Sequence, residues 1–110
     1  MKTVPDLPRI IESHRKSGES WTEFLRVPSL SMGVYVLKAG AVDPQEPHTE
    51  DEVYYIVEGR GMLRVGPEDQ VFRPGSLLFV PARAEHRFHD LQEELVALVF
   101  FAPAEGSTVR

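Results

Sequence analysis

The residues best suited to chemistry in this 110-residue chain are two histidines and two glutamates in two short segments. Glu46, His48 and Glu52 lie close together in the sequence, and His86 belongs to a second segment. Imidazole nitrogens and carboxylate oxygens are common protein ligands of divalent transition-metal ions. The chain has no cysteine, which excludes thiolate ligands, disulfides and a cysteine nucleophile. If the four side chains converge, they form a site for one divalent metal ion.

The spacing of His48 and Glu52 limits the backbone that could bring them together. A helix would place them on one face, but the segment Val53–Val57 that follows is strongly strand-like. In an unbroken strand they would stand about 13 Å apart, too far for two ligands at ~2.0–2.2 Å from one ion. We therefore expect a turn at residues 49–51, so that Glu52 opens the next strand. Glu46 and His48, two apart, would point to the same face.

The elements that must position these residues are mostly short strands. Residues 1–20 form an expected helical segment, with Asp6 as N-cap and Gly18 as its stop. From residue 21 to 103, apolar runs bounded by Gly and Pro turns recur at roughly the 8–12-residue spacing of an all-β sandwich or closed barrel. Residues 104–110 are expected to fray. At this length the sequence predicts one domain, residues 1–110.

The segment around His48 resembles the first motif of the cupin family. That motif consists of a glycine, five residues, His-x-His, three or four residues, a glutamate, six residues and a glycine. In this chain its positions are Gly40, Glu46, His48, Glu52 and Gly59. Glu46 therefore stands where the family usually has its first histidine.

The segment around His86 resembles the second cupin motif. Gly75, Pro81 and His86 stand at the expected spacing, whereas Arg83 and Asp90 stand where glycine and asparagine are usual. The two motifs, in the right order within an all-β pattern, extend the resemblance over about residues 33–101. The resemblance implies an all-β fold, a double-stranded β-helix (jelly-roll) barrel preceded by a short helix.

The resemblance also implies a metal site. It assigns His48, Glu52 and His86 as ligands of one divalent ion, and Glu46 is expected to be the fourth. Among Mn, Fe, Ni, Zn and Cu, such a set with two carboxylates favours Mn²⁺ or Fe²⁺. If Glu46 does not bind the metal, the other three residues resemble the facial triad of non-haem iron oxygenases, and Glu46 becomes a candidate catalytic base.

Three functions fit this interpretation. The first is a metal-dependent enzyme acting on a small molecule, a dioxygenase-like oxidoreductase. The second is a metal- or ligand-binding sensor module without catalysis, and the third is a cupin-type isomerase or epimerase. Tyr54 and Phe88 are candidates for the wall of a substrate pocket. His14, on the helix, and His89, of opposite strand parity to His86, are expected at the surface or at an interface.

Charge and hydropathy restrict the partners. The net charge of −5, with Lys and Arg scattered, argues against nucleic acid and anionic membranes as partners. The longest apolar run, Leu95–Pro103, is far shorter than the ~20 residues of a membrane span. Without the apolar core of a signal peptide near residue 1, a soluble, cytoplasmic protein is expected. The family resemblance further implies a homodimer.

Overall fold

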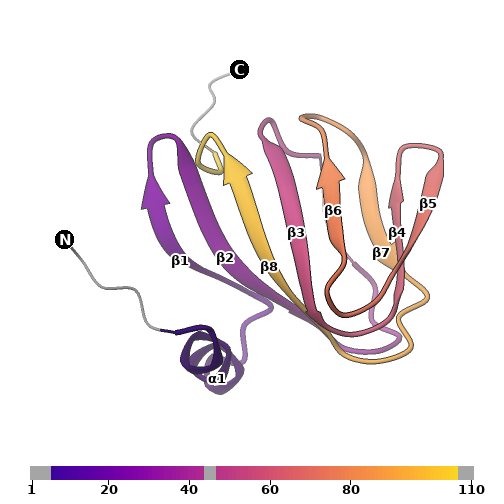
Figure 1. Ribbon diagram of the computed structural model, residues 1–110, viewed down its shortest axis with the longest axis horizontal. Helices are drawn as coiled ribbons and strands as arrows, with labels where there is room; N and C mark the ends of the chain where they lie inside the picture. The colour runs from indigo at the N-terminus through magenta and orange to yellow at the C-terminus, as the bar shows by residue number, and fades with distance from the viewer. Residues whose placement is uncertain (1–5, 44–46, 107–110) are drawn as a thin grey trace.

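The computed structural model describes residues 6–43 and 47–106 of the chain. Within these ranges the first element is the helix α1 (Leu7–Ser17) (Figure 1). The strands that follow are β1 (Trp21–Val27), β2 (Leu30–Leu37), β3 (Asp51–Glu58), β4 (Gly61–Val65), β5 (Glu68–Phe72), β6 (Leu77–Val80), β7 (His86–His89) and β8 (Leu95–Ala102). None of the described helical segments is long and apolar enough to cross a membrane.

The strands form two antiparallel sheets. One has the order β1-β2-β8-β3-β6 and the other has the order β5-β4-β7. β8 pairs with both β2 and β3, so this strand lies at the centre of the larger sheet. This arrangement confirms the expected all-β, jelly-roll barrel with a short helix before it.

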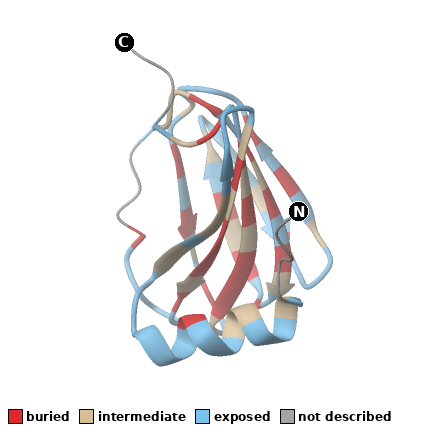
Figure 2. Cartoon of the chain, turned by 90° about the vertical axis from the view of Figure 1, so that its left-hand side faces the viewer, coloured by how far each residue is buried: buried red, intermediate tan, exposed pale blue. Residues whose placement is uncertain are grey.

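The core lies between the inner faces of the two sheets, and buried residues alternate with exposed ones along the strands (Figure 2). On β3, Glu52, Tyr54 and Ile56 are 1% exposed or less and point inward, whereas Tyr55 points outward. The period of two is the ordinary consequence of the pleat. It places Glu52 inside the barrel in spite of its charge.

The helix α1 is attached to the barrel through His14. Asp6 caps the helix by accepting a hydrogen bond from the backbone N–H of Arg9 (3.1 Å), and Gly18 ends it at φ +74°. His14 is 2% exposed, and its Nδ1 lies 2.6 Å from Oγ1 of Thr22 on β1. Burial, followed by the charge of Arg15, lowers the pKa of His14. His14, expected at the surface or at an interface, is instead buried inside this chain, because the helix turns this residue against β1.

Asp43 joins three parts of the barrel that the site depends on. The carboxylate is 3% exposed, accepts a hydrogen bond from the Tyr35 hydroxyl on β2 (2.8 Å) and accepts another from the backbone N–H of Phe88 on β7 (2.8 Å). Burial, together with the carboxylate of Asp43, raises the pKa of Tyr35. Asp43 therefore links β2 of the larger sheet to β7 of the smaller sheet.

The substitution Asp43→Ala is expected to lower the free energy of unfolding by about 3 kcal/mol, because it leaves a buried hydroxyl and a buried amide without their acceptor. Asp69→Ala is the matched control. Asp69 also bonds two side chains, Arg64 and His89, but at the surface, where such pairs contribute little to stability. Urea unfolding of both variants measures the difference, and equal losses would contradict the structural role of Asp43.

Candidate metal centre

The site lies at the end of the barrel where β3 and β7 begin. His48 directly precedes the bend at Thr49 and Glu50, Glu52 is the second residue of β3, and His86 is the first residue of β7. The bend matches the turn expected between His48 and Glu52. It shortens the distance between two side chains that an extended strand would separate.

Two hydrogen bonds from backbone N–H groups join the loop before β7 to the start of β3 and the residues just before it. The N–H of Arg83 donates to the carbonyl of His48 (2.6 Å), and the N–H of Ala82 donates to Oδ1 of Asp51 (2.9 Å). Arg83 adopts φ +68°, in the left-handed region, at the position where the motif usually has glycine. The loop before β7 is thus held beside the segment that carries His48.

The three side chains meet inside the barrel. One ligand atom from each of His48, Glu52 and His86 lies within 4.8 Å of the other two. Nε2 of His86 is 3.2 Å from Oε1 of Glu52, and these side chains are 0% and 1% exposed. Ligands of a common ion stand about 3–4 Å apart, so small side-chain rotations would complete the arrangement. Glu46, the fourth expected ligand, lies outside the described residues.

The hydrogen bonds of the site leave room for a cation. Oε1 of Glu52 is buried, and within the described part of the chain its neighbour is Nε2 of His86 at 3.2 Å. Nδ1 of His86 lies 3.0 Å from the carbonyl of Ala84, and a carbonyl can only accept. When the ring is neutral, Nδ1 carries its proton and Nε2 presents a lone pair to the site. When the ring is protonated, Nε2–H lies within reach of Oε1 of Glu52. A buried carboxylate oxygen opposite imidazole lone pairs fits a divalent ion.

The pKa of His86 reflects competition between burial and neighbouring acceptors. Burial lowers it, but the hydrogen bond to Glu52, the Ala84 carbonyl and the charges of Glu52 and Asp43 together raise it above its ordinary 6.5. In the metal-free protein, Nε2 of His86 and the Glu52 carboxylate share a proton. A metal ion must displace this proton in order to bind.

A cavity of about 140 Å³ adjoins the cluster. Glu52 and His48 lie on its wall, and the rest of the lining comes from Trp21, Tyr35, Tyr54, Val99, Phe101 and Glu105. The candidate Tyr54 thus lines the cavity. The candidate Phe88 does not: it is 1% exposed and packs edge-to-face on Tyr54 and Phe72 within the core. β7 points this side chain at the middle of the barrel, and its place in a substrate pocket stays a prediction.

Sequence reasoning missed several wall residues. Trp21, Phe101 and Glu105 come from the first strand, the last strand and the segment after it, far from both motifs. The ring of Phe101 lies edge-on to that of His48, with 4.9 Å between centroids. Neither motif gives a signal that Phe101 reaches His48.

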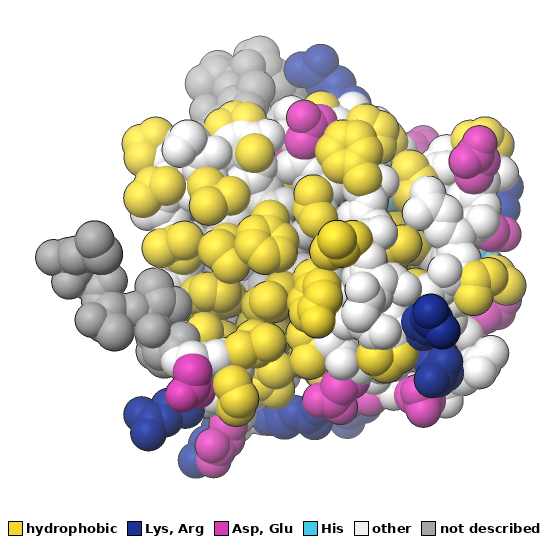
Figure 3. All heavy atoms as spheres, in the orientation of Figure 1, with side chains coloured by type: hydrophobic (Ala, Val, Ile, Leu, Met, Phe, Trp, Pro, Cys, Tyr) yellow, Lys and Arg dark blue, Asp and Glu magenta, His cyan; other side chains and the backbone are white. Residues whose placement is uncertain are grey.

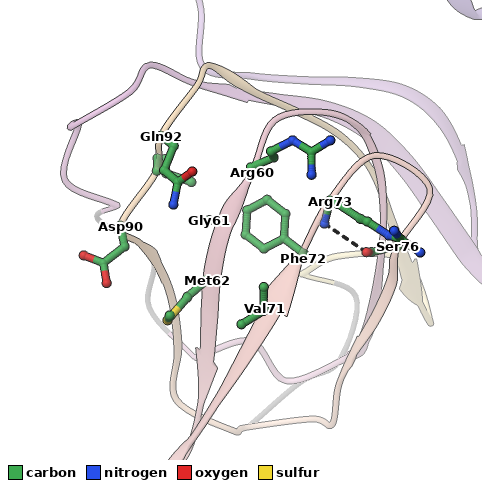
Figure 4. Close-up of a pocket in the computed structure, with 10 residues that line it drawn as sticks. Arg60, Gly61, Met62, Val71, Phe72, Arg73, Ser76, Asp90 and Gln92 are labelled. Atoms are coloured by element: carbon green, nitrogen blue, oxygen red, sulfur yellow. Dashed lines mark hydrogen bonds between the residues drawn. The ribbon is translucent and has the colours of Figure 1, made fainter.

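A second, wider pocket of about 720 Å³ opens at the other end of the barrel, where β3 and β7 end (Figure 4). Arg60 and Arg73 lie on one side of the Phe72 ring, and Asp90 lies on the other (Figure 4). Its lining contains one carboxylate and no histidine, so its residues do not form a cation site.

Fold and site together define a class: a small two-sheet barrel with a His/Glu/His cluster at one mouth. The family described as the Cupin domain matches residues 33–102. This match covers more than half of the chain, and the protein therefore belongs to the cupin family.

Three similar proteins are informative. The uncharacterized protein SCO3923 of Streptomyces coelicolor is 42% identical over 97 residues, which cover 87% of this chain and 92% of that protein. The acireductone dioxygenase of Bacillus anthracis is 39% identical over 66 residues, 54% of this chain but 38% of the enzyme's length. The crystal structure of TT1209 from Thermus thermophilus superimposes with a TM-score of 0.70 at 27% identity, covering 92% of this chain and 97% of that one.

Proposed function

We propose that this protein is a metal-dependent enzyme acting on a small organic molecule, and that its reaction is a dioxygenase-type oxidation. The observation that carries the proposal is the convergence of His48, Glu52 and His86 within 4.8 Å beside a cavity of about 140 Å³. Two histidines and one carboxylate form the donor set of mononuclear non-haem iron oxygenases. The similarity to an acireductone dioxygenase over 66 residues supports the same reaction class.

Each part of the site has a task in this proposal. When bound, an Fe²⁺ or Mn²⁺ ion would supply Lewis acidity and the redox chemistry of O₂. The carboxylate of Glu52 would neutralise part of its charge, and the Ala84 carbonyl would hold the His86 ring with Nε2 toward the site. Trp21 and Phe101, whose rings meet edge-to-face at 6.0 Å, form an apolar wall that would limit water near the substrate.

The test combines metal analysis with oxygen uptake. The protein would be loaded anaerobically with Fe²⁺ or Mn²⁺, freed of excess ion and given acireductones, diketones, catechols and flavonols. The expected result is one equivalent of metal and oxygen consumption with at least one of these classes. Tightly bound stoichiometric metal with no uptake for any class would contradict the oxygenase and favour the sensor.

The sensor remains the second candidate because of one observation. The chain matches 38% of the length of the acireductone dioxygenase, so the similarity does not extend to the rest of that enzyme. A binding module could use the same three ligands without turnover. An isomerase or epimerase would need a separate acid–base pair, but the Tyr35 hydroxyl of the cavity already donates to Asp43 (2.8 Å).

We also propose that a second copy of the chain covers the outer face of the larger sheet. On this face Leu77 is 71% exposed and Phe79 is 55% exposed. They pair across strands with Tyr55 and Val53, which in turn pair with Leu98 and Phe100 on β8. Hydrophobic side chains gather over this sheet (Figure 3). None of these six residues carries a charge, so a partner must present an equally apolar surface. The same face of a second copy, related by a two-fold axis, is such a surface.

Phe79→Glu is therefore expected to give a monomer at concentrations where the parent is dimeric, because a dimer would bury two unpaired carboxylates. Val71→Glu is the matched control, since Val71 is 77% exposed on β5 of the other sheet. Size-exclusion chromatography with light scattering reports the mass of each protein. A monomeric parent, or equal effects of the two substitutions, would contradict this interface.

A further inference from the structure

The chain that follows β8 returns across the mouth of the barrel. The N–H of Ala104 donates to the carbonyl of Pro28 (3.2 Å), and the N–H of Glu105 donates to Oγ of the buried Ser31 (2.8 Å). Nη2 of Arg26 donates to the carbonyl of Glu105 (2.7 Å). Ala104 is only 1% exposed. For these two residues the structure therefore differs from the expected fraying: they are bound to the β1–β2 hairpin.

These contacts place the Glu105 side chain over the candidate metal centre. Oε2 of Glu105 is 3.6 Å from Nδ1 of His48, and the carboxylate lines the same cavity as Glu52. The side chains of Glu105 and His48 are 30% and 22% exposed, so the contact is partly shielded from water. Phe101 packs edge-on against the His48 ring. The imidazole thus has an apolar neighbour and an acidic neighbour at its Nδ1 edge.

The two histidines are held by comparable means. A histidine that binds a metal through one ring nitrogen ordinarily donates its other N–H to a carboxylate or a backbone carbonyl. His86 has such a partner in the Ala84 carbonyl, at 3.0 Å from Nδ1. For His48 the acceptor nearest to Nδ1 among the described contacts is the Glu105 carboxylate. At 3.6 Å this is an ion-pair distance, longer than a hydrogen bond, and a small rotation of Glu105 would close it.

We propose that Glu105 is a positioning residue of the metal centre, whose carboxylate accepts the Nδ1–H of His48 and so directs Nε2 of that ring toward the ion. This inference rests on the proposed metal site. It assigns a role in that site to a residue outside both sequence motifs. Its carboxylate fixes the tautomer and orientation of His48 and increases the basicity of the ligating nitrogen.

The experiment compares Mn²⁺ affinity, measured by isothermal titration calorimetry on the full chain, for the parent, Glu105→Ala and Glu105→Gln. The Ala variant is expected to bind about 10–100-fold more weakly, since this is the usual effect of losing the acceptor behind a ligating histidine. The Gln variant should recover most of the affinity, because its amide oxygen can still accept the Nδ1–H. Glu94→Ala is the matched control: Glu94 has a similar exposure, 36%, but pairs with Arg15 at the surface.

A second readout separates positioning from a merely structural role. In Co²⁺-substituted protein, the visible absorption spectrum reports the ligand geometry and should change in Glu105→Ala but not in Glu94→Ala. Thermal unfolding of the metal-free variants checks that each still folds.

Ala and Gln variants that both lose as much affinity as His48→Ala would make Glu105 a direct ligand and overturn the positioning role. A Glu105→Ala variant that binds like Glu94→Ala would refute the role and leave the metal site intact. A parent that binds no Mn²⁺ would overturn both.

Discussion

His86→Ala and His48→Ala are each expected to weaken metal binding by more than ~100-fold. This exceeds the usual loss when only the hydrogen-bond acceptor of a metal-binding histidine is removed. His86 contributes a buried nitrogen 3.2 Å from the Glu52 carboxylate, and its removal would leave that buried carboxylate without this partner. The remaining histidine and carboxylate would form an incomplete donor set. The measurement is the metal content of protein purified without a tag, followed by calorimetric titration with Mn²⁺ and Fe²⁺.

His89→Ala is the control for these variants. His89 lies on the same short strand as His86 but at the surface, where Nε2 contacts Oδ1 of Asp69 at 2.8 Å. The substitution removes an imidazole at a comparable position in the fold without touching the cluster. Its metal content should equal that of the parent. Full retention of metal by His86→Ala would remove the basis of the proposed function.

The second large effect concerns stability and pH. A metal ion present at 100 times its Kd should stabilise the fold by about 2.7 kcal/mol. For a domain of this size, that gain raises the Tm by roughly 10 °C. At a fixed Mn²⁺ concentration we expect the increase to be largest above the pKa of His86 and to vanish as the pH falls through it, because the ion needs the neutral imidazole.

The metal-free protein should respond to pH in the opposite direction. Neighbouring acceptors outweigh burial and hold the folded pKa of His86 above the ordinary 6.5, so the folded state binds this proton more tightly than the unfolded chain. The stabilisation is fully present below about pH 6.5 and is lost as the pH rises through the folded pKa. Differential scanning calorimetry with and without Mn²⁺, from about pH 5.5 to about pH 8.5, measures both trends. A metal-induced increase in Tm that does not depend on pH would contradict the prediction. His14, whose lowered pKa gives the opposite pH dependence, is present in both proteins, so the metal-free contribution of His86 is measured as the difference between the parent and His86→Ala.

Much of the fold could be predicted from local patterns. Short apolar runs predicted the strands, and turn residues such as Gly59 and Gly75 marked where strands end, because the pleat and the positive-φ turn impose their requirements on a few neighbouring residues. The family motifs likewise singled out His48, Glu52 and His86, which the structure brings within 4.8 Å of one another. These inferences succeeded where spacing along one segment limits the geometry.

What surrounds the cluster was decided by tertiary structure. Strand parity says on which side of a sheet Phe101 lies, but only the register between β8 and its two neighbours places it at the cavity beside His48. The burial of His14 depends on how the helix docks on β1, which its own sequence does not specify.

Glu105 illustrates the same limit most clearly. In sequence it is one acidic residue in a polar tail, and its position depends on hydrogen bonds to Ser31 and Arg26, more than 70 residues earlier. The sequence by itself thus determined an all-β pattern, since this follows from short-range periodicity, and its resemblance to the cupin motifs implied the barrel class and the three candidate ligands. The tertiary structure decided the walls of the cavity and the partners of the ligands, because contacts between distant segments depend on the packing of the whole chain.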